Sequence, residues 1–183
     1  IAGVERKKKL DQFCDGNMWL KAFYASHTFE VDFLMERNSF EAIQTLPLIF
    51  TQKKRIKDST KLLKSNDVSV AGREMLRLAD KLGKGWFALI LSEKVTYETF
   101  MPQYILEALA FASQESLDES TSHAMGLYRI RQAREEEGFK ELYREIDALE
   151  GVPSEEFLKK YREKLPEDQL TQFVKCREAQ NAG

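Results

Sequence analysis

Apolar residues recur every three or four positions along most of this chain, which is the spacing of one face of an α-helix. The clearest case lies between Asn66-Asp67, residues typical of helix N-caps, and Gly83, a residue type common just after helix C-termini. The apolar positions between them are Val68, Ala71, Met75, Leu78, Ala79 and Leu82. The pattern therefore predicts an amphipathic helix that ends at Leu82.

Similar patterns predict helices on both sides of this one. An apolar helix is expected from Trp86 to Val95, and another from about Pro102 to Ala112. The acidic, hydroxyl-rich stretch from Glu115 to Ser122 is interpreted as a linker, followed by short amphipathic helices. The predicted domains are therefore residues 1–114 and a helical appendage, residues 115–183.

One stretch departs from the helical pattern. Trp19 to Ala25 is short, rich in aromatic residues and without helical period, which predicts a buried strand. The polar residues Ser26-His27-Thr28 interrupt it, and Phe29 to Glu36 is again helical in character. The expected fold class is therefore mainly α-helical with one or two short strands.

Glu30 is the first candidate functional residue, because the pattern places its carboxylate in the first turn of a helix, just past the strand. Burying an unpaired ionised carboxylate costs several kcal/mol, whereas a helix N-terminus returns only about 0.3–1 kcal/mol. A cation would be the simplest partner for a buried Glu30. A solvated first-turn glutamate is the alternative, and this stretch alone favours it.

Lys84 is the second candidate, because it stands between Gly83 and Gly85 at the start of an apolar helix. Free backbone N–H groups, the positive end of a helix dipole and a mobile ammonium together suit a phosphate. Gly85 would allow the backbone to approach such a ligand closely. A tight turn between helices with an exposed lysine is the alternative, and the spacing alone favours it.

Composition limits the functions that remain. The chain has 183 residues and a net charge of -2, so no global basic field points to nucleic acid. Cys14 and Cys176 have no partner pattern, which predicts free thiols in a cytoplasmic protein, and no apolar stretch suggests a membrane span. The only two histidines, His27 and His123, make a Ser-His-Asp mechanism untenable. Metal-assisted phosphodiester chemistry remains open.

Three segments together resemble a known family: ASHTFEVDFL (25–34), KGWFALILSEKV (84–95) and PQYILEALAFA (102–112). They are similar, in order and separation, to the C-terminal part of the Toprim domain in overcoming-lysogenization-defect (OLD) family ATP-dependent nucleases. The resemblance covers roughly residues 4–112. It implies the C-terminal portion of a Toprim-like α/β fold, here with a helical tail.

The resemblance also implies a function: a DNA endonuclease that depends on Mg²⁺ or Mn²⁺, often serves in phage defence and works with an ATPase domain or subunit. Thr28 and Glu30 match the family's residues at the second metal position. Lys84 matches the lysine that steadies charge on the phosphate, so Glu30 and Lys84 would be the catalytic residues. Assembly into a homo-oligomer is compatible with this interpretation.

The chain also departs from the family. It lacks the upstream glutamate and the Asp-x-Asp pair that Toprim chemistry needs, and Asp11 and Asp15 have the wrong spacing for that pair. Because the sequence begins at Ile1 without methionine, we expect a fragment or one piece of a split protein, with half a metal site and no nuclease activity alone.

Two alternatives belong to other classes. The first is a non-catalytic helical interaction module that kept the scaffold and lost the chemistry. The second is a helical DNA-binding domain that uses the basic stretch Lys53 to Lys64 and binds without metal in a salt-dependent way. The net negative charge ranks this DNA-binding domain last.

Overall fold

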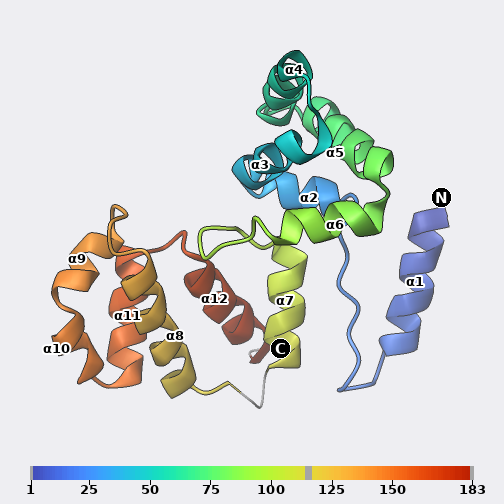
Figure 1. The fold of residues 1–183 in the computed structure, drawn as a ribbon. Helices are drawn as coiled ribbons and strands as arrows, with labels where there is room; N and C mark the ends of the chain where they lie inside the picture. Colours follow the sequence, from blue (N-terminus) through green and yellow to red (C-terminus); the bar gives the residue numbers. More distant parts are fainter. Residues whose placement is uncertain (1, 114–116, 182–183) are drawn as a thin grey trace. The chain divides into compact units, whose positions relative to one another are not determined.

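The computed structural model describes residues 2–113 and 117–181, and in this part of the chain every regular element is a helix (Figure 1). The prediction of a mainly helical protein is confirmed. The helices are α1 (Ala2–Cys14), α2 (Phe29–Met35), α3 (Ser39–Ile49), α4 (Lys53–Leu63), α5 (Val68–Leu82), α6 (Lys84–Ser92), α7 (Gln103–Ala112), α8 (Glu119–Gln132), α9 (Phe139–Arg144), α10 (Ile146–Glu150), α11 (Ser154–Lys164) and α12 (Gln169–Asn181).

The predicted strand from Trp19 to Ala25 is wrong, because the described residues contain no strand. The segment has turn and irregular backbone instead. A strand needs a second strand to pair its backbone groups, and nothing else in the described chain takes that form. Trp19, predicted to be buried, is 69% exposed.

The described chain forms two compact units (Figure 1). The first unit combines Ile1–Tyr24 with Gln103–Gly183, and the second unit is Ala25–Pro102. The predicted boundary between residues 114 and 115 lies outside the described residues, so that domain division stays a prediction. Of the expected linker, Glu119–Ser122 forms the first turn of α8.

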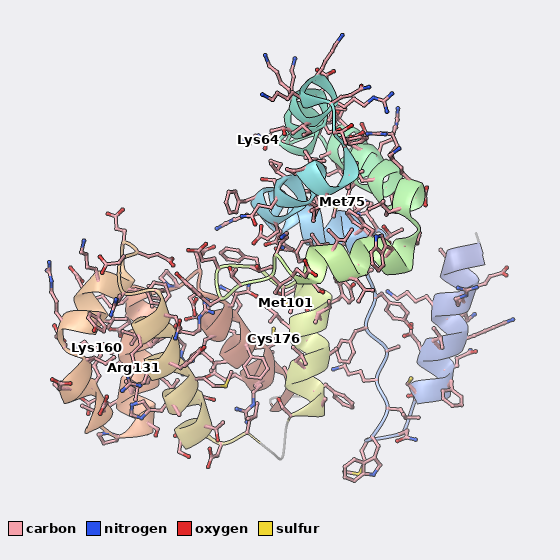
Figure 2. The ribbon with its side chains drawn as sticks, viewed as in Figure 1. Lys64, Met75, Met101, Arg131, Lys160 and Cys176 are labelled. Carbon is pink, nitrogen blue, oxygen red and sulfur yellow. The ribbon has the colours of Figure 1, made fainter. Side chains whose placement is uncertain are left out.

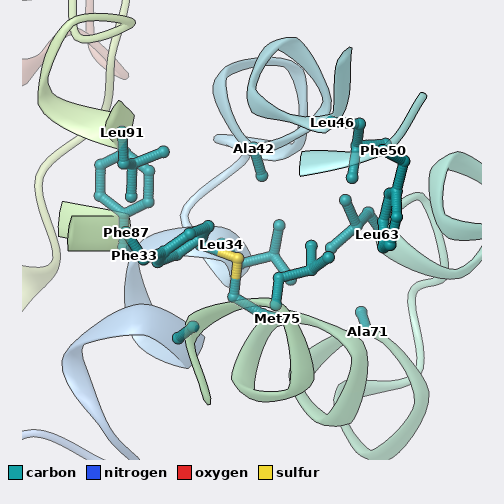
Figure 3. Packing of buried hydrophobic residues seen from close by; sticks show 12 residues of the cluster. Phe33, Leu34, Ala42, Leu46, Phe50, Leu63, Ala71, Met75, Phe87 and Leu91 are labelled. Atoms are coloured by element: carbon teal, nitrogen blue, oxygen red, sulfur yellow. The ribbon is translucent and has the colours of Figure 1, made fainter. Parts of the chain in front are cut away.

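The second unit has a continuous apolar core formed by α2 to α6 (Figure 3). Helix α2 approaches α5 closely at Gly72, where an added Cβ would lie 3.0 Å from Cγ1 of Val31. This close contact fixes α2 against α5. The fully or nearly fully buried apolar residues of this core are Phe33, Leu34, Ala42, Leu46, Phe50, Leu63, Ala71, Met75, Leu78, Ala79, Phe87 and Leu91.

Buried polar contacts attach the segment before α7 to the same unit. Asn38, 1% exposed, donates from Nδ2 to the carbonyls of Phe33 (2.8 Å) and Phe100 (2.6 Å). Its Oδ1 accepts from the Phe100 amide at 2.8 Å. The Thr99 hydroxyl donates to Oε1 of buried Glu41 at 2.8 Å. These bonds satisfy polar groups that would be costly to bury alone.

In the first unit, a buried ionic network joins α8, α11 and the start of α12. The Arg129 guanidinium donates from Nε to Asp168 Oδ2 at 3.0 Å. The other oxygen of Asp168 accepts from the Tyr161 hydroxyl at 2.7 Å and the Leu170 amide at 3.0 Å. Burial and the Asp168 carboxylate raise the pKa of Tyr161, so its hydroxyl remains a donor. Because the carboxylate is fully hydrogen-bonded, this ion pair can be buried.

The packing of α8 against α11 depends on Gly126. A Cβ added to Gly126 would lie 2.5 Å from Cε1 of Phe157. The Phe157 ring cannot easily retreat, since it stacks on His123 with centroids 4.0 Å apart and packs against Tyr161. His123 is itself held by a 3.0 Å hydrogen bond between Nε2 and the Leu149 carbonyl.

We expect Gly126→Ala to destabilise the protein by about 1–3 kcal/mol, the usual cost of overpacking a rigid core. Thermal unfolding followed by circular dichroism measures this loss. Gly3→Ala in α1 is the matched control, because an added Cβ there meets nothing within 4 Å. A Gly126→Ala midpoint equal to or above that of the wild type would contradict the packing described.

Candidate functional site

The structure brings the two predicted catalytic residues together. Oε1 of Glu30 and Nζ of Lys84 lie 3.8 Å apart, although the residues belong to α2 and α6. Both residues lie in the second unit. The sequence resemblance assigned roles to these residues separately, and the fold places them side by side.

Helical spacing explains why Glu30 faces Lys84. Phe33 and Leu34 follow Glu30 by three and four positions and are both buried, so all three share one face of α2. On α6, Phe87 and Leu91 follow Lys84 by three and seven positions and are also buried. Each of these two candidate side chains therefore extends the apolar face of its helix by one turn, at the edge of the same core.

The Glu30–Lys84 pair is close but not tightly bonded. A distance of 3.8 Å exceeds the 2.7–3.2 Å of an N–H···O hydrogen bond, so the contact is electrostatic. The Glu30 side chain is 15% exposed, whereas that of Lys84 is 59% exposed. A pair with one solvated partner contributes about 0.2–1 kcal/mol. The carboxylate is therefore sheltered, while the ammonium can leave it for another anion.

The turn that carries Lys84 forms as the sequence predicts. Helix α5 ends at Leu82, and Gly83, with φ of 81°, connects it directly to α6. The left-handed region favours glycine, so this residue type suits the turn. A Cβ added to Gly85 would meet nothing within 4 Å, which leaves the backbone beside Lys84 open.

Thr28, the second predicted metal ligand, is the N-cap of α2. Its carbonyl accepts from the amides of Val31 (3.1 Å) and Asp32 (3.0 Å). Its side chain is exposed and makes no capping hydrogen bond. The helix therefore does not use the hydroxyl. The structure brings Glu30 and Lys84 close together. Thr28 is placed only at the N-cap of α2, the helix that carries Glu30.

Asp32 is a residue that the sequence reasoning did not assign. Its Oδ2 accepts from the Ser26 amide at 2.8 Å, and its Oδ1 lies 2.9 Å from Nδ1 of His27. The His27 amide also donates to this carboxylate at 3.2 Å. Asp32 thus orders the loop that leads into α2 and to Glu30. Its position two residues after Glu30 in the Thr-Phe-Glu-x-Asp segment was the available signal.

Oxygen donors such as Glu30 and the Thr28 hydroxyl are of the type that Mg²⁺ and Mn²⁺ prefer. Within residues 2–113 and 117–181, no three His, Cys, Asp or Glu side chains gather closely enough to hold a metal ion. An ion held by Glu30 and Thr28 would therefore take its remaining ligands from water, a phosphate or another chain. The donor set fits part of a metal site.

A cleft of about 560 Å³ in the first unit is another candidate site, and its lining includes Lys7, Lys21 and Tyr24. Two of its cations rest on aromatic rings: Lys7 lies 4.9 Å from the centroid of Tyr24, and Lys21 lies 5.6 Å from that of Phe23. These cation–π contacts already use the charges and ring faces that a ligand would need.

Comparison with known proteins adds no further assignment: no family model, curated protein or solved structure matches this chain. The site is therefore defined by its own geometry. Among the described residues, no helix is long and apolar enough to cross a membrane.

We expect Asp32→Ala to release the loop before α2. Each lost hydrogen bond to a charged group is worth about 1.5–3 kcal/mol, so amide exchange at Ser26 and His27 should accelerate by about tenfold or more. Hydrogen exchange followed by NMR measures this change. Asp32→Asn, which retains one acceptor oxygen, should give an intermediate rate. Unchanged exchange in Asp32→Ala would show that the carboxylate does not order the loop.

Proposed function

We propose that this chain is the C-terminal part of an OLD-type Toprim nuclease, that is, of a DNA endonuclease that depends on Mg²⁺ or Mn²⁺. The observation that supports this proposal is the 3.8 Å approach of Glu30 and Lys84. The family resemblance matches these two residues to one phosphodiester site. They belong to different helices, and their side chains lie close together. The ATPase domain or subunit and the role in phage defence belong to the same proposal.

The two side chains have complementary roles in this chemistry. A divalent cation, when bound, activates water and offsets charge on the phosphate. Glu30 would hold such an ion through a carboxylate that is already sheltered from bulk water. Lys84 would turn from Glu30 to the phosphate and stabilise negative charge as the P–O bond breaks. The exposed Thr28 hydroxyl would supply a neutral oxygen ligand.

The Glu30–Lys84 contact serves as the resting state of such a site. Without metal or phosphate, the ammonium is the cation that partners the sheltered carboxylate. Because this contact is weak, a divalent ion can replace the ammonium at low cost. The ion adds more charge than it displaces, and the freed lysine then becomes available to a substrate.

One observation favours the non-catalytic interaction module as a second candidate. Trp86 and Leu89 on α6 are each 60% exposed, and Phe40 on α3 is 63% exposed. Large apolar residues on a surface often mark contacts with another protein. Under this alternative, Glu30 would be a structural partner of Lys84 and would show no selective affinity for divalent ions.

Mn²⁺ binding separates the two candidates. We expect Mn²⁺ to broaden amide NMR signals near Glu30 and Lys84 in the isotope-labelled chain. Glu30→Gln should weaken this effect about tenfold or more, the scale of losses seen when metal sites lose supporting groups. Lys84→Gln should strengthen it, because an ammonium 3.8 Å from the carboxylate repels the ion. Glu93→Gln and Lys61→Gln, which alter exposed residues of the same unit, are the controls.

Equal broadening in the wild type and in Glu30→Gln would refute the metal role and favour the interaction module. A Lys84→Gln variant with unchanged or weaker Mn²⁺ binding would contradict the proposed competition between the ammonium and the ion.

We also expect the chain alone to leave supercoiled plasmid DNA intact in Mg²⁺ or Mn²⁺, because the upstream glutamate and the Asp-x-Asp pair are missing from its sequence. Agarose electrophoresis of the plasmid measures nicking. Metal-dependent nicking by the wild type that Glu30→Ala abolishes would show that the chain carries a complete site, contrary to this expectation.

A further inference from the structure

Helix α4 carries a dense group of positive charges on its surface. It has six cationic residues in and immediately after the helix, and all six are exposed: Lys53, Lys54, Arg55, Lys57, Lys61 and Lys64. Figure 2 shows nitrogen-tipped side chains that project outward around α4, including the labelled Lys64. Among the described residues, no carboxylate forms an ion pair with any of these six cations.

Four of the six cations lie along one side of α4. The core-facing side of α4 includes Ser59 and Leu63, which are buried. Four lysines follow each other along the outward side at intervals of four, four and three residues: Lys53, Lys57, Lys61 and Lys64. Such spacing keeps side chains on one face. With a rise of 1.5 Å per residue, the stripe is about 16 Å long. We call these four residues the α4 stripe.

This arrangement of like charges destabilises α4. Like charges at i and i+4 destabilise a helix by about 0.2–0.5 kcal/mol for each pair. The first turn holds Lys53, Lys54 and Arg55 and no acidic residue, although the helix dipole favours anions there. The N-cap, Gln52, makes no side-chain capping hydrogen bond. An anion along α4 would relieve both kinds of repulsion.

Nearby acidic groups do not neutralise the stripe. On the packed helix α5, Glu74 is buried and accepts from Arg77 Nε at 2.7 Å. Burial alone would raise the pKa of Glu74, but the bonds from Arg77 and Ser59 outweigh it and lower that pKa. Asp67 accepts from the Ser69 amide at 2.8 Å as the N-cap of α5. These carboxylates already accept hydrogen bonds within the fold. Asp58 is the only acidic residue within α4.

We infer that the α4 stripe binds the phosphate backbone of a nucleic acid, without a divalent metal. A row of lysines with regular spacing matches a row of phosphates, and lysines that replace condensed counterions gain affinity from their release. An anionic membrane is less suitable, because the apolar residue of α4 that is most exposed, Leu62 at 39%, does not lie on the stripe. The inference extends the proposed function, since an endonuclease needs a surface that holds DNA.

Fluorescence anisotropy with a labelled DNA duplex and with a single strand of the same length tests this inference, in EDTA and with the full chain. Four phosphate contacts predict a slope of log affinity against log salt of about -3 to -4, so binding should weaken roughly a hundredfold between about 50 and 200 mM salt. The form that binds more tightly, duplex or single strand, is the form of nucleic acid that the stripe prefers. Binding of either form with this salt dependence supports the inference.

Substitutions in α4 test whether this helix carries the nucleic-acid binding. The fourfold change of Lys53, Lys57, Lys61 and Lys64 to Gln should reduce the salt slope to near zero and weaken binding at least about tenfold. Lys57→Gln with Lys61→Gln alone should lower the slope by about 2, so the test remains decisive if the fourfold variant does not fold. The matched control changes four exposed lysines elsewhere, Lys8, Lys9, Lys140 and Lys159, to Gln.

The inference is overturned if the α4 variants bind DNA as the wild type does, or if the control variant loses binding equally. It is also overturned if neither the duplex nor the single strand binds, whether or not vesicles containing phosphatidylserine do. The α4 binding is measured in EDTA, so it does not depend on a metal ion at Glu30. Failure of the Mn²⁺ test with intact α4-dependent binding would therefore reject the nuclease proposal and leave this inference standing.

Discussion

The close packing of α2 on α5 determines most of what is distinctive in the second unit. Gly72 allows Val31 to approach closely, since a Cβ at position 72 would lie only 3.0 Å from Cγ1 of Val31, and this contact helps to hold a helix of only seven residues in place. A helix this short is not stable alone, so its position comes from burial of Val31, Phe33 and Leu34. Because Glu30 extends the same face, the core decides where its carboxylate lies.

Two ion pairs in this chain differ in how far their charges are buried. In the pair of Arg129 and Asp168, the carboxylate is 6% exposed and accepts several further hydrogen bonds, so its geometry is fixed. In the pair of Glu30 and Lys84, the carboxylate is sheltered but the ammonium remains solvated at 3.8 Å. Removing one partner of the first pair would leave a buried charge unpaired, which is costly. The second can exchange its partner, which is what a phosphodiester site would require.

The two proposals for the second unit depend on the same principle, a charge without a strong partner. Lys84 is loosely paired at the edge of the core, and the α4 stripe lies on a helix whose first turn has no acidic residue. Elsewhere in the unit, Glu74 is matched by Arg77, and Asp32 by backbone amides and His27. Glu74 and Asp32 are thus paired within the fold, and the two proposals place an anion at cations that lack such a close partner.

The sequence by itself determined the local elements. The helix from Val68 to Leu82 and the glycine at 83 appear as predicted, because helical spacing and glycine turns depend on neighbouring residues. The helix after them was predicted from Trp86 to Val95 and runs from Lys84 to Ser92. It also singled out Glu30 and Lys84, which the fold brings together.

Features that depend on contacts between distant segments of the chain were determined only by the tertiary structure. The aromatic run from Trp19 has no strand to pair with in the described part of the chain, so its composition gave a wrong strand prediction. Asn38 binds Phe33 and Phe100, and Asp32 orders the loop before α2, contacts that no periodicity encodes. Joining Ile1–Tyr24 with Gln103–Gly183 in one unit likewise required the fold. Spacing along the chain fixes which face a side chain occupies, whereas its partner is set by packing between segments far apart in sequence.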